Sequence, residues 1–316
     1  MRGERCREQP LSSCTSSGTQ RMDPPSRRRS SGARLTSSLY GYSAGVLVAA
    51  NNYKALPPEA KLSHISNMGD VERIGSLVQY MTIATEDNFF HALNKGSKLN
   101  ELRCHLAKLR LLPVPKFIYF GGHSERDDAR DEFDYLPGDY SGSGNTISLS
   151  RLSSRASYSC IRPRFRDKLD LKLVTDFCNA NNFLGLQWVL KRNSVGKLCW
   201  EESEEFDPSR GSLGHRILHF ASSAKHQQTY STSKGSFFNQ EFLNAEYGTT
   251  GASMVPISLS CRLETIQSRT AKSIQQYNAQ RRPSAEALGQ QEPQLYSSEK
   301  LDLENPQSLA ELLHSL

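Results

Sequence analysis

The clearest hydrophobic pattern in the chain lies at residues 97–112, where leucines recur at helical spacing. The leucines that share this face are Leu99, Leu102, Leu106 and Leu109. Spacings of three, four and three residues bring side chains together on one side of a helix. Pro113 and Pro115 follow, and proline ends a helix because it lacks the backbone N–H. The pattern predicts an amphipathic helix.

A different pattern begins directly after these prolines. The run Phe117–Phe120 consists of aromatic and β-branched residues, and Gly121 and Gly122 close it. Such residues favour a buried strand, because their side chains pack well on a pleated surface. We therefore predict one short β element at this place.

Several other apolar stretches follow helical spacing, while Leu39–Lys54 fits either a strand or a buried helix. The stretches with helical spacing are Val71, Ile74, Val78 and Met81, a segment from Thr85 to Leu93, the set Leu169, Leu173 and Phe177, the segment Leu213–Ala221, and a polar helix at Ser260–Arg282. Apolar residues at i, i+3, i+4 and i+7 are typical of a helix that covers a core. The predicted fold class is therefore mainly α: a small helical domain with one short β element, flanked and interrupted by disordered segments rich in Ser, Arg and Gly.

Composition divides the chain into four segments. Residues 1–38 are expected to form a disordered basic tail. Residues 39–200 are expected to form a mostly helical domain with a flexible acidic and Ser-rich insertion at about 124–160. Residues 201–256 are predicted to be a poorly ordered polar segment that includes the short helix. Residues 257–316 should hold the polar helix, a linker and a C-terminal amphipathic helix.

The net charge of +6 is concentrated at the N-terminus. The first 38 residues carry eight arginines against three acidic residues, so the rest of the chain is nearly neutral. A neutral fold lacks the electrostatic attraction that dominates binding to phosphate backbones, and nucleic acid is not an expected partner. A weak nucleic-acid binder that uses the basic tail and residues 151–172 is the last-ranked alternative.

Seven cysteines are scattered along the chain without the paired spacing of a zinc site or a disulfide framework. Free thiols fit a reducing compartment. The longest apolar run, residues 44–50, is too short for a membrane helix, and no membrane insertion is expected. We predict a cytoplasmic and/or nuclear protein, with a mitochondrial transit peptide as the minority alternative and Met22 as an alternative start.

One segment is similar to a catalytic motif. The sequence GHSER at residues 122–126 resembles the G-x-S-x-G elbow of α/β-hydrolases, where a tight turn after a strand exposes a nucleophilic serine. Arg126 replaces the final glycine, and the alternating strand–helix pattern of that fold is absent. A serine hydrolase with a degenerate elbow at Ser124 is therefore kept as an alternative, and no residue is assigned as catalytic.

Neither a metal nor a cofactor is predicted. The acidic run at residues 124–139 holds seven acidic side chains. A calcium loop that starts at Asp127 would place Ala129 at position 3 and Glu132 at position 6, where an oxygen ligand and a glycine are needed. Walker, dinucleotide-binding and zinc-protease sequences are also absent.

Serines follow arginines in three segments predicted to be disordered. The candidate phosphorylation sites are Ser30, Ser31, Ser153, Ser154, Ser157 and Ser284. A phosphate adds about −1.5 to −2 charges beside these arginines, which can create a docking site for a phosphoserine reader. At the C-terminus, Leu309, Leu312 and Leu313 form an L-x-x-L-L stripe that resembles the coactivator peptides of nuclear receptors. The alternative for this candidate docking helix is that it packs on its own domain.

These features predict a non-enzymatic intracellular adaptor or regulatory subunit. Its flexible segments and helical surfaces would bind a protein partner, of unknown identity, under the control of phosphorylation.

Overall fold

The computed structural model describes residues 45–51, 53, 69–70, 72–74, 90–95, 98–111, 116–127, 132–140, 146–147, 171–208, 216–247, 258–282 and 285–304. These residues all lie within one compact unit, Leu39–Leu316. Within these ranges, no helix combines the length and the apolar character that a membrane span requires.

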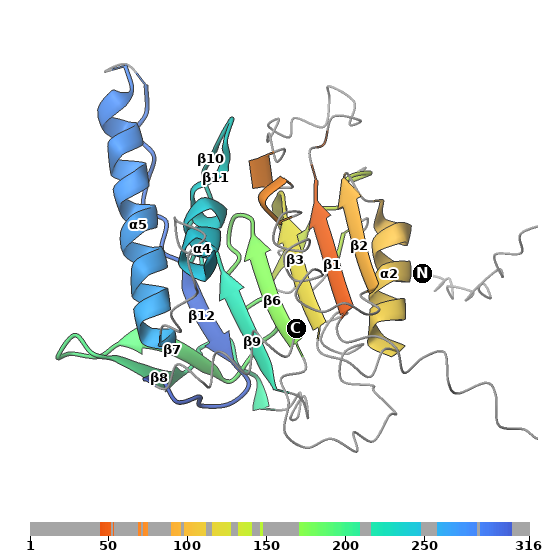
Figure 1. The fold of residues 1–316 in the computed structure, drawn as a ribbon, viewed down its shortest axis with the longest axis horizontal. Helices are drawn as coiled ribbons and strands as arrows, with labels where there is room; N and C mark the ends of the chain where they lie inside the picture. Colours follow the sequence, from red (N-terminus) through yellow and green to blue (C-terminus); the bar gives the residue numbers. More distant parts are fainter. Residues whose placement is uncertain are drawn as a thin grey trace, which may run out of the picture. The chain divides into compact units, whose positions relative to one another are not determined.

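A mixed eight-stranded sheet forms the centre of this unit (Figure 1). In spatial order, its strands are β2 (Phe90–Lys95), β1 (Gly45–Ala50), β3 (Lys116–Gly121), β6 (Leu171–Asp176), β9 (Ile217–Ala221), β12 (Gln294–Ser297), β7 (Trp188–Arg192) and β8 (Leu198–Glu202). The first five strands are parallel, whereas β12 is antiparallel to both β9 and β7, and β7 pairs with β8 as an antiparallel hairpin. The predicted mainly α class is therefore wrong, because the chain has an α/β fold built on a large sheet.

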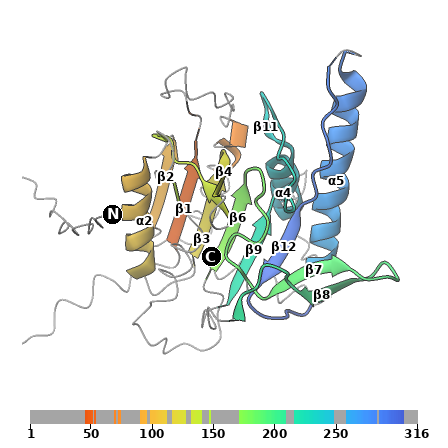
Figure 2. The same cartoon turned by 180° about the vertical axis from the view of Figure 1, so that it is seen from behind.

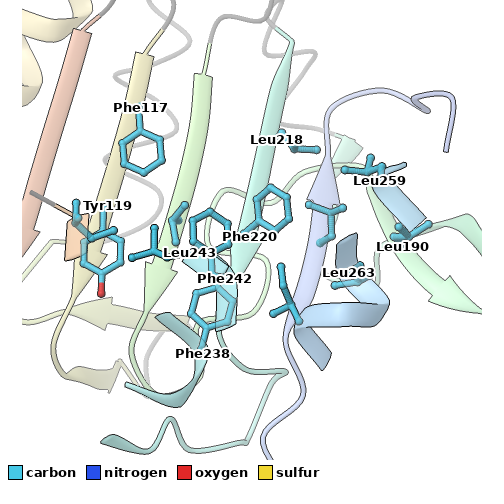
Figure 3. Packing of buried hydrophobic residues seen from close by; sticks show 14 of the residues in the cluster. Phe117, Tyr119, Leu190, Leu218, Phe220, Phe238, Phe242, Leu243, Leu259 and Leu263 are labelled. Atoms are coloured by element: carbon cyan, nitrogen blue, oxygen red, sulfur yellow. The ribbon is translucent and has the colours of Figure 1, made fainter. Parts of the chain in front are cut away.

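The central strands are buried on both sides, as parallel strands are when helices cover both faces of a sheet. All residues of β1 are buried, and in β3 and β6 only the first residue is partly exposed. Helices α4 (Phe237–Tyr247) and α5 (Leu259–Gln280) cover one face. Figure 3 shows Phe238 and Phe242 of α4 packed beside Phe220 of β9. This cluster is one of the two cores that the described residues form.

Helix α2 (Leu99–Leu111) covers the opposite face. Its Leu102 and Leu109 are fully buried against the second core, and Figure 2 shows the helix beside β1 and β2. At its start, the N–H of Leu99 donates to the Asp139 carboxylate over 2.8 Å. This bond satisfies one of the backbone donors that the first turn of a helix leaves without a partner.

Two short hairpins lie outside the large sheet. The first joins β4 (Ser124–Asp127) to β5 (Glu132–Tyr135), and β4 begins only three residues after β3 ends. The second joins β10 (Ser231–Thr232) to β11 (Gly235–Ser236), directly before α4. Both hairpins therefore belong to connections that leave the carboxyl ends of parallel strands.

Three predicted elements are confirmed: the leucine-rich helix is α2, the aromatic strand is β3, and the polar helix is α5. Three predicted helices are wrong. The segment with Leu173 and Phe177 contains β6, Leu213–Ala221 contains β9, and Thr85–Leu93 overlaps β2. The buried parallel strands show no regular alternation of apolar and polar residues, so their pattern is easily taken for that of a buried helix.

Candidate functional site

Strands β3 and β6 are parallel neighbours, and reactive side chains follow both of them. The last residues of the two strands are register partners, and beyond them the N–H of Gly122 donates to the Asp176 carbonyl over 3.1 Å. Two residues further on, the Ser124 hydroxyl donates to the carbonyl of Cys178. The main chains at His123 and Cys178 therefore lie at the same level of the carboxyl edge of the sheet, on neighbouring strands about 4.8 Å apart.

The half-buried thiol of Cys178 faces the loop that follows β9. Its sulfur accepts the backbone N–H of Thr229 over 3.4 Å and lies 4.0 Å from the Thr229 carbonyl oxygen. Burial raises the pKa of the Cys178 thiol, the charge of Asp176 raises it further, and the N–H groups of Thr229 and of Cys178 itself lower it. Backbone donors are thus already directed at the atom on which a thiolate charge would form.

Tyr53, which follows β1, contacts both the main chain and the ring of His123. The Tyr53 hydroxyl accepts the N–H of His123 over 2.8 Å and donates to the Leu136 carbonyl over 2.8 Å. The two rings lie 5.0 Å apart, inclined at 42°. Gly122, directly before His123, has a φ of 152°, and a Cβ at this position would collide with the Tyr53 hydroxyl. Only glycine allows this presentation of His123.

A tight turn follows Cys178. Asn179 has a φ of 55°, a left-handed conformation that asparagine tolerates better than most residues. Its N–H donates to the Gln227 carbonyl over 2.9 Å, and the N–H of Ala180 donates to the Ser223 hydroxyl over 3.2 Å. A strained turn that its surroundings hold firmly, directly beside a reactive side chain, is frequent at functional sites.

Two buried carboxyl groups lie beside the end of β6. Asp176 accepts the hydroxyl groups of Tyr119 over 3.0 Å and Ser236 over 2.9 Å. Asp70 accepts the Ser236 N–H over 3.0 Å and the Asn239 side-chain amide over 2.8 Å. Burial raises the pKa of both carboxyl groups, and the negative charge of Asp70 raises that of Asp176 further. Through Ser236 and Asn239, the pair connects the start of α4 to β6, the strand that Cys178 follows.

Of the residues singled out in the sequence, the structure places only Ser124. It begins β4, and its hydroxyl contacts the Cys178 carbonyl. The others lie outside the described residues: Ser30, Ser31, Ser153, Ser154, Ser157, Ser284, Leu309, Leu312 and Leu313. In the described part of the chain, no three His, Cys, Asp or Glu side chains are grouped so that they could hold a metal ion.

No protein-family model matches this sequence, and no curated protein is significantly similar to it. The structure is similar to the crystal structure of caspase-1 from Spodoptera frugiperda, with a TM-score of 0.51 and 10% sequence identity over 81% of this chain and 86% of that chain. A structural-genomics protein from Geobacter sulfurreducens has a TM-score of 0.49 and 13% identity, over 83% of this chain and 97% of that chain. At this identity, the likeness to the caspase shows the fold alone: the chain has a caspase-like α/β fold.

The sequence analysis did not identify His123 and Cys178 as a pair. Each residue follows the last residue of its apolar strand by two positions, and the two are 55 residues apart. The sequence shows each of the two residues after an apolar run, but their relation becomes visible only when residues 171–176 are assigned as a strand that pairs with β3.

Proposed function

We propose that this protein is a cysteine-dependent hydrolase in which Cys178 is the nucleophile and His123 is the general base. The observation that carries the proposal is the position of the two residues on adjacent strand ends at the same level of the sheet. A thiol and an imidazole in neighbouring positions are the minimum set for nucleophilic catalysis by cysteine. The caspase-like fold supports the proposal.

In the proposed reaction, the Cys178 thiol gives its proton to the His123 imidazole, and the sulfur bonds to the carbonyl carbon of the substrate. When the tetrahedral intermediate collapses, the bond to the leaving group breaks and His123 returns the proton to the departing amine. Water then hydrolyses the thioester with His123 as base, which releases the acid and restores the thiol. In this proposal, a backbone N–H beside the sulfur, such as that of Cys178, stabilises the oxyanion.

A peptide bond is the substrate that the fold favours. The residues around the nucleophile read DFCNA at 176–180 and differ from the Q-A-C-x-G sequence of caspases, so the substrate preference of that family is not transferred here. Asp176, two residues before Cys178, is buried and holds its proton near neutral pH, so its carboxyl group provides no charge that would select a substrate. The preferred residue before the scissile bond is therefore left to a panel of peptides.

The test compares single variants of the full chain on a panel of fluorogenic peptides with cationic, anionic and apolar residues before the cleaved bond. Cys178→Ala and His123→Ala should each lower kcat/KM by at least about 100-fold, because each removes a group that reacts directly. Cys261→Ala is the matched control, since this exposed cysteine lies on α5. Its activity should equal that of the unaltered protein.

Ser124→Ala separates the cysteine proposal from the serine hydrolase. The Ser124 hydroxyl only supports the Cys178 carbonyl in the proposal, so we expect a loss of less than about tenfold. Loss of all activity in Ser124→Ala with full activity in Cys178→Ala would instead establish the serine as nucleophile. Absence of both hydrolysis and labelling of Cys178 by an electrophilic peptide probe would leave the adaptor function as the better explanation. That function stays a prediction, because its serine clusters and leucine stripe lie outside the described residues.

A further inference from the structure

The loop after β9 is attached to the residue that precedes the nucleophile. The Phe177 carbonyl oxygen faces three hydroxyl groups of this loop: those of Ser222 at 3.3 Å, Ser223 at 3.4 Å and Thr229 at 3.0 Å. The hydroxyls of Ser222 and Thr229 also bond to each other over 2.7 Å. A carbonyl oxygen has two lone pairs, so the shortest of these bonds, from Thr229, is the dominant one.

The same loop is supported from its other side by Gln291, a buried residue just before β12. The Gln291 side-chain amide donates to the Ser222 carbonyl over 3.0 Å, and its side-chain oxygen accepts the N–H of Tyr230 over 3.1 Å. The two bonds hold the loop at residues on both sides of its turn. Thr229 therefore lies in a segment that is attached both to the chain after β6 and to the chain before β12, with β9 between these two strands.

This attachment determines where the Thr229 main chain points. With its hydroxyl on the Phe177 carbonyl, Thr229 directs its own N–H at the Cys178 sulfur over 3.4 Å. We propose that Thr229 is a positioning residue for the nucleophile, whose hydroxyl holds its N–H against the sulfur so that the reactive thiolate is stabilised. The role rests on the proposed function, because it matters only if Cys178 reacts.

A donor at this place has a specific chemical use. Burial and the charge of Asp176 both raise the pKa of the Cys178 thiol, and His123 on the adjacent strand is the other titratable group at this level of the sheet. A hydrogen bond to the charged form of a group favours that form. The Thr229 N–H therefore counteracts the two effects that make the thiolate less stable.

The experiment measures the rate at which iodoacetamide alkylates Cys178 between pH 5 and pH 10, with modified peptides quantified by mass spectrometry. Thr229→Val keeps the shape of the side chain but removes the hydroxyl, and we expect the midpoint of the pH profile to rise by roughly half a unit or more. Thr229→Ser restores a hydroxyl and should return the midpoint to within about 0.2 units of the unaltered protein. In the peptide assay, Thr229→Val should lower kcat more than it changes KM.

An unchanged midpoint in a folded Thr229→Val variant would overturn the proposal, as would an equal shift in Thr229→Ser. If Thr229→Val does not fold, Ser222→Ala takes its place, because it removes the hydroxyl that bonds to that of Thr229. Its midpoint must move in the same direction, and an unchanged value again counts against the role. Alkylation needs no substrate turnover, so a shifted midpoint in a protein that cleaves no peptide would support the positioning role while contradicting the hydrolase.

Discussion

Asp176 has a buried carboxyl group whose surroundings raise its pKa. It is 4% exposed, and burial together with the charge of Asp70 raises its pKa to about 8. The unfolded chain releases this proton near pH 4, whereas the folded protein holds it to about pH 8. Because the folded state binds more protons across this window, its stability should fall as the pH rises from 4 to 8.

This pH dependence can be tested with Asp176→Asn, which keeps the shape and stays neutral at every pH. We expect the variant to lose less free energy of unfolding between pH 5 and pH 8.5 than the unaltered protein, by at least about 1 kcal/mol. Urea unfolding at a series of pH values measures the difference, with the exposed Asp302→Asn as the control. Parallel curves for Asp176→Asn and the unaltered protein would show that Asp176 does not hold the proton.

The candidate site could be predicted from the sequence only in part, because its two reactive residues are far apart in the sequence. The G-x-S-x-G comparison requires its residues to be neighbours in sequence, and it therefore selected Ser124. His123 and Cys178 become neighbours only because β3 pairs with β6, a contact across 55 residues. Apolar patterns describe each strand separately, and they do not state which strands pair.

At the scale of the elements, the sequence predicted the secondary structure correctly where the helical period and the strand period give different patterns of apolar residues. Helix α2 has a leucine face next to exposed polar residues, so only the helical period fits. Leu173 of β6 and Phe177, which directly follows the strand, are four residues apart, a spacing that places side chains on one face of a helix and also on one face of a strand. Both faces of β6 are buried, so its polar residues, Lys172, Thr175 and Asp176, did not mark a side that faces solvent.

The leucine face of α2 gives a quantitative test of the second core. Leu102 is fully buried, whereas Leu106 is only partly buried at the edge of the same cluster. Leu102→Ala should reduce the free energy of unfolding by about 2–4 kcal/mol, because it leaves a cavity that the rigid sheet cannot fill. Leu106→Ala should cost about half as much, since water already reaches the site. Equal losses in urea unfolding would mean that α2 is rotated from the position described.

At the scale of the whole molecule, β12 joins two parts of the sheet. It pairs with β9 on one side over four residues and with β7 on the other side over two. A chain that stops after Gly289 would lack β12 and leave β9 and β7 as open edges, which promote association between chains. We expect this truncation to be aggregated in size-exclusion chromatography, whereas a chain that stops after Glu304 should elute as the full protein does. A soluble protein of normal size from the shorter chain would contradict this assignment of β12.

The position of β12 also sets the order in which the protein can be completed during synthesis. The strand lies between β9 and the β7–β8 hairpin in space but follows both of them in sequence. Gln291, which holds the loop beside Cys178, leaves the ribosome just before β12 does. The sheet and the support of the thiol are therefore finished in a single late step. A nascent chain shorter than about 290 residues has no complete site, so the hydrolase proposed here would gain its activity only after β12 has been made.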